Sequence, residues 1–250
     1  MAKILVLNPN SSRSMTDGVK KVVASAELPQ GTDIHYYTGP SSAPASINDG
    51  DDIDASVQAV KADAWPYIKE QGFDGIVVAC FSVHPLVVEL ARENILATGI
   101  FEASILTALP LLLPDEKWGI VTTGKFWEAH LLHGVQHFLG ASVSDSNDKF
   151  AGVESTGLIA SDFHHGVSPE VINQKIREAT KRLLRKGKVT CVAMGCAGMA
   201  GLEDQIRTAA MEECGEDFAY KTFKVIDGVA AGVMQVEQLI RQQWLLKRGS

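Results

Sequence analysis

The sequence predicts an α/β fold of two pseudosymmetric lobes, each a parallel sheet flanked by helices, with the functional site in the cleft between the lobes. Two observations support this prediction. Short apolar runs alternate with longer amphipathic segments along the chain, which is typical of parallel strands joined by helical crossovers. The two halves of the chain also carry similar motifs in the same order, which indicates an internal repeat.

The strands are expected where short apolar runs are bounded by turn residues. In chain order these runs are Lys3–Asn8, Asp33–Tyr37, Gly75–Ala79, Trp118–Thr122, Val189–Gly195 and Thr222–Ile226. Helices are expected between them, where apolar residues recur with a helical period. In chain order these segments are Thr16–Ser25, Asp52–Gln71, Pro85–Ala97, Phe126–Phe138, Ser168–Arg185 and Gly228–Lys247.

Several of these helices carry start signals. Asp51 or Asp52 is the expected N-cap of the second helix, and Pro85 is expected in the first turn of the third. Ser168 is the expected N-cap of the fifth helix.

The repeat places a polar turn and a cysteine at corresponding points of the two halves. In the first half, the first strand leads into Asn8–Ser12, and a later strand is followed by Cys80. In the second half, the first strand leads into Thr122–Gly124, and a later strand is followed by Cys196. Because ligands bind beyond the carboxyl ends of strands in open parallel sheets, the turn and the cysteine of each half should border the same crevice.

The expected lobes follow from this repeat. We expect the first lobe to comprise residues 1–97 together with 210–250, and the second lobe to comprise residues 98–209. Two such lobes facing each other would place Cys80 and Cys196 on opposite sides of one cleft.

Composition narrows the functional class. The chain has 250 residues, of which 46% are hydrophobic and 21% are charged, and its formal net charge is -7 at pH 7. These values are ordinary for a soluble globular enzyme. Because no basic stripe is interleaved with aromatic residues, we expect no nucleic-acid partner.

No segment of the sequence predicts a membrane partner. The longest apolar runs, such as Ile105–Leu113, fall short of the roughly 20 residues that a membrane span needs. The amino terminus lacks the apolar stretch and cleavage site of a signal peptide, which predicts a cytoplasmic protein. In that compartment the cysteines should be thiols rather than disulfides.

The cysteines carry the main chemical signal. Cys191 lies within a strand and Cys214 lies in Met211–Gly215, so both are expected to be structural. Cys80 and Cys196 each precede a helix start, where backbone N–H groups can lower a thiol pKa by about one unit or more. Across a cleft they could act as base and acid on opposite faces of one carbon. The alternative is that both are ordinary buried cysteines, which their equivalent placement argues against.

Four short motifs then resemble a known family. Asn8–Ser12, Ala79–Ser82, Gly99–Ala103 and Gly195–Met199 are similar to motifs of the hydantoin and allantoin racemases of the Asp/Glu racemase superfamily. The resemblance covers nearly the whole chain, and the segment Cys80–Leu86 is similar to the fungal branch. Val83 is a departure, because many members are expected to carry an Asp there that could bond to the helix start or to the substrate.

The resemblance implies a cofactor-independent racemase of allantoin or 5-substituted hydantoins, with neither a metal nor pyridoxal phosphate. Cys80 and Cys196 would alternate as general base and general acid. The residues implied to hold the substrate are Asn10, Ser11, Ile47, Phe81, Ser82, Thr122, Thr123, Gly195, Ala197 and Gly198. An Asn or a Ser after a strand can instead serve only as a helix cap. We also expect a homo-oligomer, for which Trp244 and Leu245 on the last helix would suit an interface.

Other titratable residues have simpler interpretations. His130, His133 and His137 follow helical spacing without a nearby Cys or acidic ligand motif, so we expect an exposed or interfacial helix face rather than a metal site. His84 could tune the Cys80 thiol or cap the helix that follows. Glu102 is expected to begin a helix rather than act as a base.

Three alternatives remain on this scaffold. An arylmalonate decarboxylase-like enzyme would need only one proton donor, so the presence of both cysteines argues against it. A maleate isomerase also uses two cysteines and stays open. A non-catalytic small-molecule binder is disfavoured by the intact cysteine pair, although the departure at Val83 keeps it open.

Overall fold

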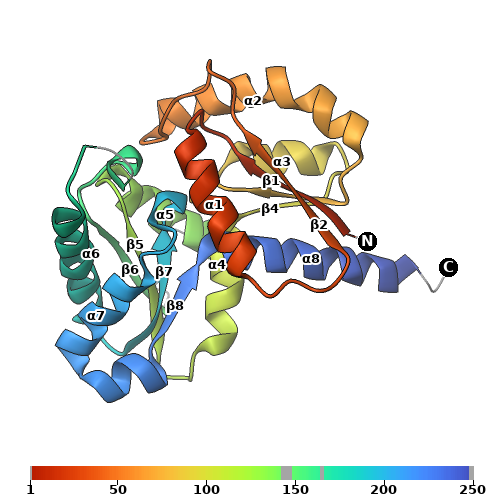
Figure 1. Cartoon of the computed structure of the whole chain (residues 1–250). Helices are drawn as coiled ribbons and strands as arrows, with labels where there is room; N and C mark the ends of the chain where they lie inside the picture. Colours follow the sequence, from red (N-terminus) through yellow and green to blue (C-terminus); the bar gives the residue numbers. More distant parts are fainter. Residues whose placement is uncertain (1, 142–147, 164–165, 248–250) are drawn as a thin grey trace. The chain divides into compact units, whose positions relative to one another are not determined.

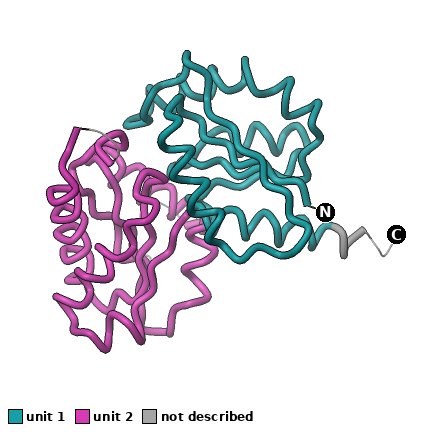
Figure 2. Tube along the Cα trace, viewed as in Figure 1, with its two compact units in different colours: residues 1–103, 229–250 teal, residues 104–228 magenta. Residues whose placement is uncertain are grey.

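The computed structural model describes residues 2–141, 148–163 and 166–247, and it describes side chains as far as residue 243. The chain forms two compact units, Met1–Ala103 with Val229–Ser250, and Ser104–Gly228 (Figure 2). The chain thus passes from the first unit to the second and returns. The divisions fall after residue 103 and before residue 229, whereas the repeat in the sequence predicts them after residue 97 and before residue 210.

Each unit contains a four-stranded parallel sheet with the same strand order (Figure 1). In the first unit the order is β2-β1-β3-β4, with β1 Ala2–Asn8, β2 Thr32–Thr38, β3 Gly75–Val78 and β4 Ala97–Gly99. In the second unit it is β6-β5-β7-β8, with β5 Lys117–Thr122, β6 Phe150–Ser155, β7 Val189–Gly195 and β8 Lys224–Asp227. Corresponding strands occupy corresponding places, which confirms the prediction of two pseudosymmetric parallel sheets flanked by helices.

Helices complete each unit. Those of the first unit are α1 Arg13–Ser25, α2 Gly50–Gln71, α3 Pro85–Arg92 and most of α8 Gly228–Lys247. Helix α4 Ile100–Ala108 crosses from the first unit to the second. Those of the second unit are α5 Phe126–Phe138, α6 Pro169–Leu184 and α7 Glu203–Cys214, with the short helical turns η1 Leu109–Leu111, η2 Ala160–Phe163, η3 Ala197–Met199 and η4 Phe218–Thr222.

Side chains alternate between the two faces of a strand, and in the first unit the central strands β1 and β3 are buried on both faces apart from Lys3. Leu7 and Val78 point to the face covered by α2 and α3, where Val60 and Leu90 belong to the same apolar cluster. The opposite face meets α8, although that helix follows the last strand of the second sheet. There Gly232 comes so close to the sheet that a Cβ would lie 2.8 Å from Val77 Cγ1.

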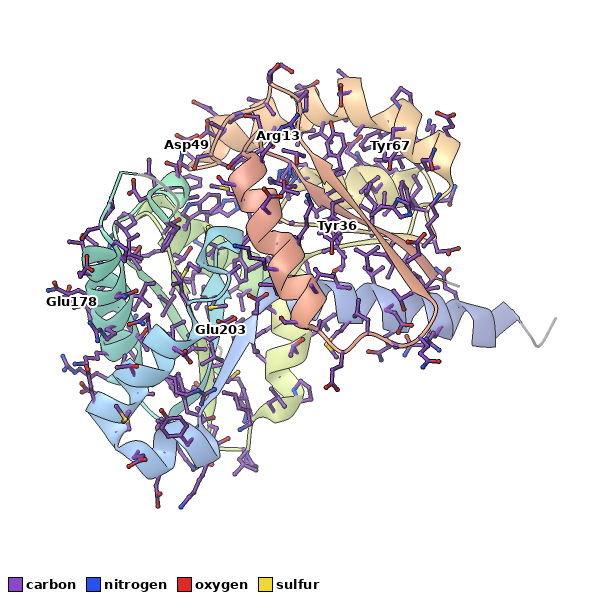
Figure 3. The ribbon with its side chains drawn as sticks, viewed as in Figure 1. Arg13, Tyr36, Asp49, Tyr67, Glu178 and Glu203 are labelled. Atoms are coloured by element: carbon purple, nitrogen blue, oxygen red, sulfur yellow. The ribbon has the colours of Figure 1, made fainter. Side chains whose placement is uncertain are left out.

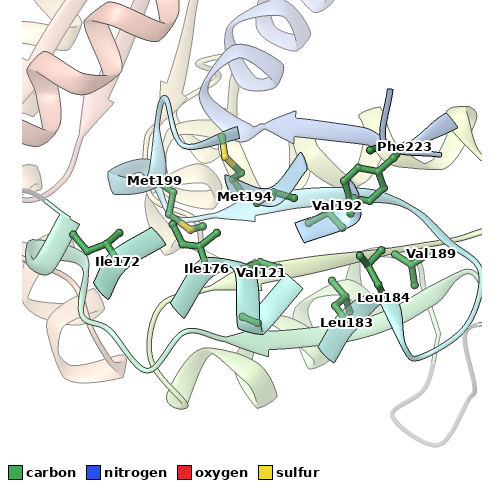
Figure 4. Packing of buried hydrophobic residues seen from close by; sticks show 14 of the residues in the cluster. Val121, Ile172, Ile176, Leu183, Leu184, Val189, Val192, Met194, Met199 and Phe223 are labelled. Atoms are coloured by element: carbon green, nitrogen blue, oxygen red, sulfur yellow. The ribbon is translucent and has the colours of Figure 1, made fainter. Parts of the chain in front are cut away.

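The core of the second unit lies between its sheet and the helices α6 and α7. Val121, Val192 and Met194 of the sheet are buried with Ile176 and Leu183 of α6 (Figure 4). Burying an aliphatic side chain contributes about 1.5–3 kcal/mol. This apolar layer therefore holds β5 and β7 in register and so fixes the loops that follow them.

The structure corrects the expected helix over Pro85–Ala97. Helix α3 ends at Arg92, and Asn94 adopts a left-handed backbone with φ 59°. A short polar side chain tolerates that conformation, which ends the helix. The chain then forms β4, which pairs with β3. Strands β4 and β6 and helix α7 were not expected from the sequence, and of α4 only a helix start at Glu102 was expected. The expected strand Thr222–Ile226 begins later, at Lys224, because η4 occupies the preceding residues.

The start of α2 is also corrected. Its N-cap is Asp49, at the amino end of the helix in Figure 3, whose side chain accepts a hydrogen bond from the Asp52 backbone N–H at 3.0 Å. Asp51 and Asp52 lie inside the first turn, where their charges complement the helix dipole. The other start signals are confirmed: Pro85 begins α3, and Ser168 caps α6 by accepting from the Val171 N–H.

The described part of the chain also bears on the expected absence of a membrane span and on the expected interface residues of the last helix. None of its helices has the length and apolar character to span a membrane. Trp244 and Leu245 lie in α8, but their side chains fall outside those that the structure describes.

Gly232→Val should destabilise the protein by about 2 kcal/mol or more, because overpacking of a tight helix–sheet contact costs roughly 1–3 kcal/mol. A branched side chain there would meet both Val77 and Ile100. Denaturant unfolding measures the change. The matched control is Met234→Ala on the exposed side of the same helix, where 55% of the residue is exposed and a change within about 0.5 kcal/mol is expected. Equal effects of the two substitutions would contradict the close contact.

Candidate active site

In the first unit, the turn after β1 is built around the side chain of Asn8. Its Nδ2 donates to Asn10 Oδ1 and to Thr16 Oγ1, each at 3.0 Å, and its Oδ1 accepts from the Asn10 backbone N–H at 3.2 Å. Asn8 is only 2% exposed. Because these polar atoms satisfy one another out of water, the turn has a fixed shape.

The predicted binding residues Asn10, Ser11 and Ile47 all lie near this turn. Asn10 is buried, and its Oδ1 also accepts from the Ser12 backbone N–H at 2.9 Å. The Ser11 N–H donates to the Pro44 carbonyl at 3.0 Å, which ties the turn to the loop that carries the buried Ile47. The N-cap of α1 is Ser12 rather than Asn10 or Ser11.

Cys80 follows β3, the strand next to β1. Leu7 and Val78 are partners in this parallel pair, so the turn after β1 and the cysteine after β3 lie at the same edge of the sheet. Cys80 is half-buried, and its Sγ lies 3.4 Å from Ser82 Oγ. Ser82 is fully buried, and its backbone N–H donates to the Cys80 carbonyl at 3.0 Å.

The loop after Cys80 is packed by aromatic and imidazole rings. Phe81, one of the predicted binding residues, is buried. Its ring contacts Phe101 edge to face, with ring centroids 5.6 Å apart. Val83 is 38% exposed and makes no equivalent anchor. The following residue, His84, is the N-cap of α3, and its Nδ1 accepts from the Leu86 N–H at 3.3 Å. The bond to the helix start that Val83 cannot make is therefore made by His84.

The second unit repeats the arrangement at β5 and β7. Thr122 is the register partner of Gly195, and its hydroxyl donates to the Gly195 carbonyl at 2.8 Å. A Cβ at Gly195 would lie 2.7 Å from Thr122 Cβ and 2.8 Å from the Val121 carbonyl oxygen. Only glycine allows this approach of the two strands, so the residue before Cys196 is fixed by packing. The neighbouring predicted residue Thr123 is buried as well.

Cys196 stands at the start of the turn η3. It is half-buried, and its Sγ accepts a hydrogen bond from the Gly198 N–H at 3.3 Å. Burial raises the pKa of the Cys196 thiol to about 11, although the N–H groups of Gly198 and Met199 act in the opposite direction. The expectation of a lowered pKa is therefore wrong for Cys196, because desolvation outweighs the two backbone donors.

The other cysteines lie elsewhere. Cys191 is fully buried within β7, where burial raises its pKa to about 12. This agrees with a structural role. Cys214 is exposed at the end of α7.

Glu102 and His130, two other titratable residues considered from the sequence, lie in helices. Glu102 lies in the first turn of α4 as expected, and burial raises its pKa to about 7. His130 stacks on Phe126 with centroids 5.4 Å apart. Within the described ranges, no three His, Cys, Asp or Glu side chains are grouped as metal ligands.

Each unit thus brings together its own predicted residues at the carboxyl edge of its sheet. Asn8 was expected only as a member of the turn Asn8–Ser12, and Ser56 was not expected to belong to this architecture. Ser56 is fully buried and lies near His84. A signal for it exists, since Ser56 is a polar residue on the otherwise apolar buried stripe of α2 that contains Ile53, Val57 and Val60.

Comparisons with known proteins agree with the resemblance seen in the motifs. A family model described as Asp/Glu/Hydantoin racemase matches residues 4–236. An uncharacterised protein of Schizosaccharomyces pombe is 35% identical over 246 residues, covering 96% of this chain and 93% of that protein. A hydantoin racemase of a Pseudomonas species is 28% identical over 242 residues, covering 95% and 86%. The solved allantoin racemase from Klebsiella pneumoniae is similar with a TM-score of 0.77 at 25% identity, covering 97% and 89%.

The buried ring of His84 should make folding stability depend on pH. Burial lowers its pKa from 6.5 to about 4, so the unfolded chain binds the proton more readily than the folded chain. The stability that the neutral ring provides is complete above its unfolded pKa and falls by about 3 kcal/mol as the pH drops to the folded value. His84→Asn should lose this component. Urea unfolding of both proteins between pH 7.5 and pH 4.5 measures it, and parallel pH curves would contradict it.

Proposed function

The chain belongs to the Asp/Glu/hydantoin racemase family and is an isomerase of the racemase type, and we propose that it inverts the stereocentre of a hydantoin-type ring. The substrate class is allantoin or a 5-substituted hydantoin, and Cys80 and Cys196 are the two proton carriers. The proposal uses no metal and no organic cofactor.

One observation carries this proposal. Cys80 follows β3 and Cys196 follows β7, and these strands hold the same place in two sheets of identical order. A racemase without a cofactor needs a base on one face of the carbon and an acid on the other. A repeated unit that presents one thiol from each copy suits this requirement, since each thiol serves one face.

The proposed reaction is a proton transfer at one carbon. The thiolate on one side removes the proton from the ring stereocentre, and the electron pair moves onto the adjacent carbonyl oxygen. The thiol on the other side then donates its proton to the opposite face of the same carbon. The product has inverted configuration, and the thiol and thiolate have exchanged places.

The pKa of Cys196 supports an assignment of starting roles. With a value raised to about 11, Cys196 is a thiol at neutral pH. A thiol is the form that donates a proton, so Cys196 would begin as the acid for the enantiomer whose ring proton faces Cys80, and Cys80 would then be the base. The backbone N–H groups around η3 would limit the cost of charge on Cys196 when the reaction runs in reverse.

The substrate class rests on relatives and on the binding residues that the motif resemblance implies. The Pseudomonas relative is a hydantoin racemase and the Klebsiella structure is an allantoin racemase. In this proposal Phe81 and Ile47 would contact the apolar part of the ring, and Asn10, Ser11 and Thr123 would bond to its carbonyl and N–H groups. Circular dichroism with single enantiomers of allantoin, 5-substituted hydantoins and amino acids tests this directly. If the circular dichroism signal decays with the amino acids but with neither allantoin nor the hydantoins, the proposed substrate class is overturned.

Cys80→Ser and Cys196→Ser should each abolish net racemisation, because a serine hydroxyl is a far weaker acid than a thiol. Each variant should still exchange the ring proton of one enantiomer for deuterium, and the two variants should favour opposite enantiomers. NMR in deuterated water, started from each enantiomer separately, measures this exchange. Cys191→Ser is the matched control for a cysteine within the strand. Normal racemisation by either of the first two variants would remove that cysteine from the mechanism.

Alkylation of Cys196 should be slow at neutral pH and should rise about tenfold for each pH unit up to pH 10, because only the thiolate reacts. The reason is the raised pKa of the Cys196 thiol. Iodoacetamide labelling followed by peptide mass spectrometry measures the rate, with the exposed Cys214 of the same molecule as reference. A Cys196 rate that is already constant below pH 8 would show that its pKa is low instead.

A further inference from the structure

We propose that His84 is a positioning residue for Cys80, and that it acts by fixing the loop between β3 and α3 to the buried Ser56 of α2. The inference rests on the proposed function for its effect on turnover. Its effect on the Cys80 thiol can be measured without any substrate.

The hydrogen bonds of His84 show which of its two ring nitrogens carries the proton. Ser56 Oγ donates to the Ile53 carbonyl at 2.7 Å, so its hydrogen is already used. The 3.1 Å contact between Ser56 Oγ and His84 Nε2 therefore has the ring as donor. Nδ1 is then unprotonated and accepts from the Leu86 N–H. The ring is a neutral Nε2–H tautomer that links α2 to the start of α3.

This arrangement makes His84 unsuited to proton transfer. The residue is only 1% exposed, and both ring nitrogens have protein partners. Burial also lowers its pKa to about 4, so the ring stays neutral at physiological pH. His84 therefore cannot supply a positive charge to stabilise a nearby thiolate. What it can supply is a fixed end point for the loop.

The loop has two ends, and only one of them is held by the sheet. At the first end the Ala79 N–H donates to the Leu7 carbonyl at 2.8 Å, which extends the pairing of β3 with β1. At the second end, His84 holds the loop through Ser56 and through the first turn of α3. The exposed Val83 between them provides no comparable anchor.

Ser82 transmits this constraint to the sulfur. It lies two residues from His84, is fully buried, and places its Oγ 3.4 Å from Cys80 Sγ. A shift of the His84 end of the loop changes this distance and so changes the hydrogen bond to the thiol. Because thiolate reactivity depends on such partners, the pH dependence of Cys80 alkylation reports the position of Ser82.

Three variants separate the two contacts of the ring. Ser56→Ala removes the acceptor of Nε2–H and leaves the helix cap. His84→Asn keeps a cap acceptor near the position of Nδ1 but cannot reach Ser56. His84→Gln places an amide N–H near the position of Nε2 and is the conservative rescue. The matched control is Thr180→Val in α6, which removes another fully buried hydroxyl bonded to a helix carbonyl, Ile176, in the second unit.

The experiment measures the alkylation rate of Cys80 against pH by peptide mass spectrometry, with Cys196 of the same molecule as internal reference, together with kcat, KM and Tm. Ser56→Ala and His84→Asn should shift the Cys80 profile while the Cys196 profile stays the same. They should also lower kcat by about tenfold or more, because misplacing a reacting group by about 1 Å can cost up to 10²-fold. His84→Gln should recover part of both effects, and Thr180→Val should change neither.

An unchanged Cys80 profile and an unchanged kcat in Ser56→Ala, with only a lower Tm, would overturn the proposal and leave His84 as a structural cap. Ser56→Ala decides the question if His84→Asn does not fold, since it removes a single hydroxyl. If the wild type racemises none of the substrates, the proposed function fails, but the shift in the Cys80 profile still tests the positioning role.

Discussion

The parallel pairing of the first strand with the third in each repeat is the constraint on which the rest depends. It joins Leu7 to Val78 in one sheet and Thr122 to Gly195 in the other. Because parallel strands end at the same edge, each pairing brings a polar turn next to a cysteine-bearing loop. The apolar layers beneath hold this register, since a slip by one residue would turn buried side chains such as Val121 towards the opposite face.

Desolvation and backbone hydrogen bonding compete at the Cys196 sulfur that this framework presents. Two N–H donors near Cys196 favour the thiolate, yet burial has the larger effect and keeps the thiol protonated. For the proposed two-base reaction such a balance has a use. One carrier must hold a proton while the other is free to accept one, and different surroundings at the two sites would set the starting state without a cofactor.

Much of this organisation can be predicted from sequence, because the apolar residues of the longer strands and helices recur with a clear period. The segment Val189–Gly195 is a strand with its predicted ends, and Phe126–Phe138 is a helix with its predicted ends. The failures have local causes. The end of α3 depends on the left-handed Asn94, and β4 has only three residues, too few to show a periodicity. Side-chain networks are harder still, since the contact of Ser56 with His84 joins residues that are distant in sequence.

The contrast between Val83 and His84 shows how a departure from a family motif can be misread. Read alone, Val83 in place of an expected Asp suggests that a bond to the start of α3 has been lost. In the structure the neighbouring imidazole makes that bond, and its second nitrogen adds a contact to α2 that the short side chain of an Asp could not span from the cap. The cap at His84 holds the helix start and also ties the cysteine loop to a second helix. The departure at Val83 therefore does not leave the start of α3 without a cap.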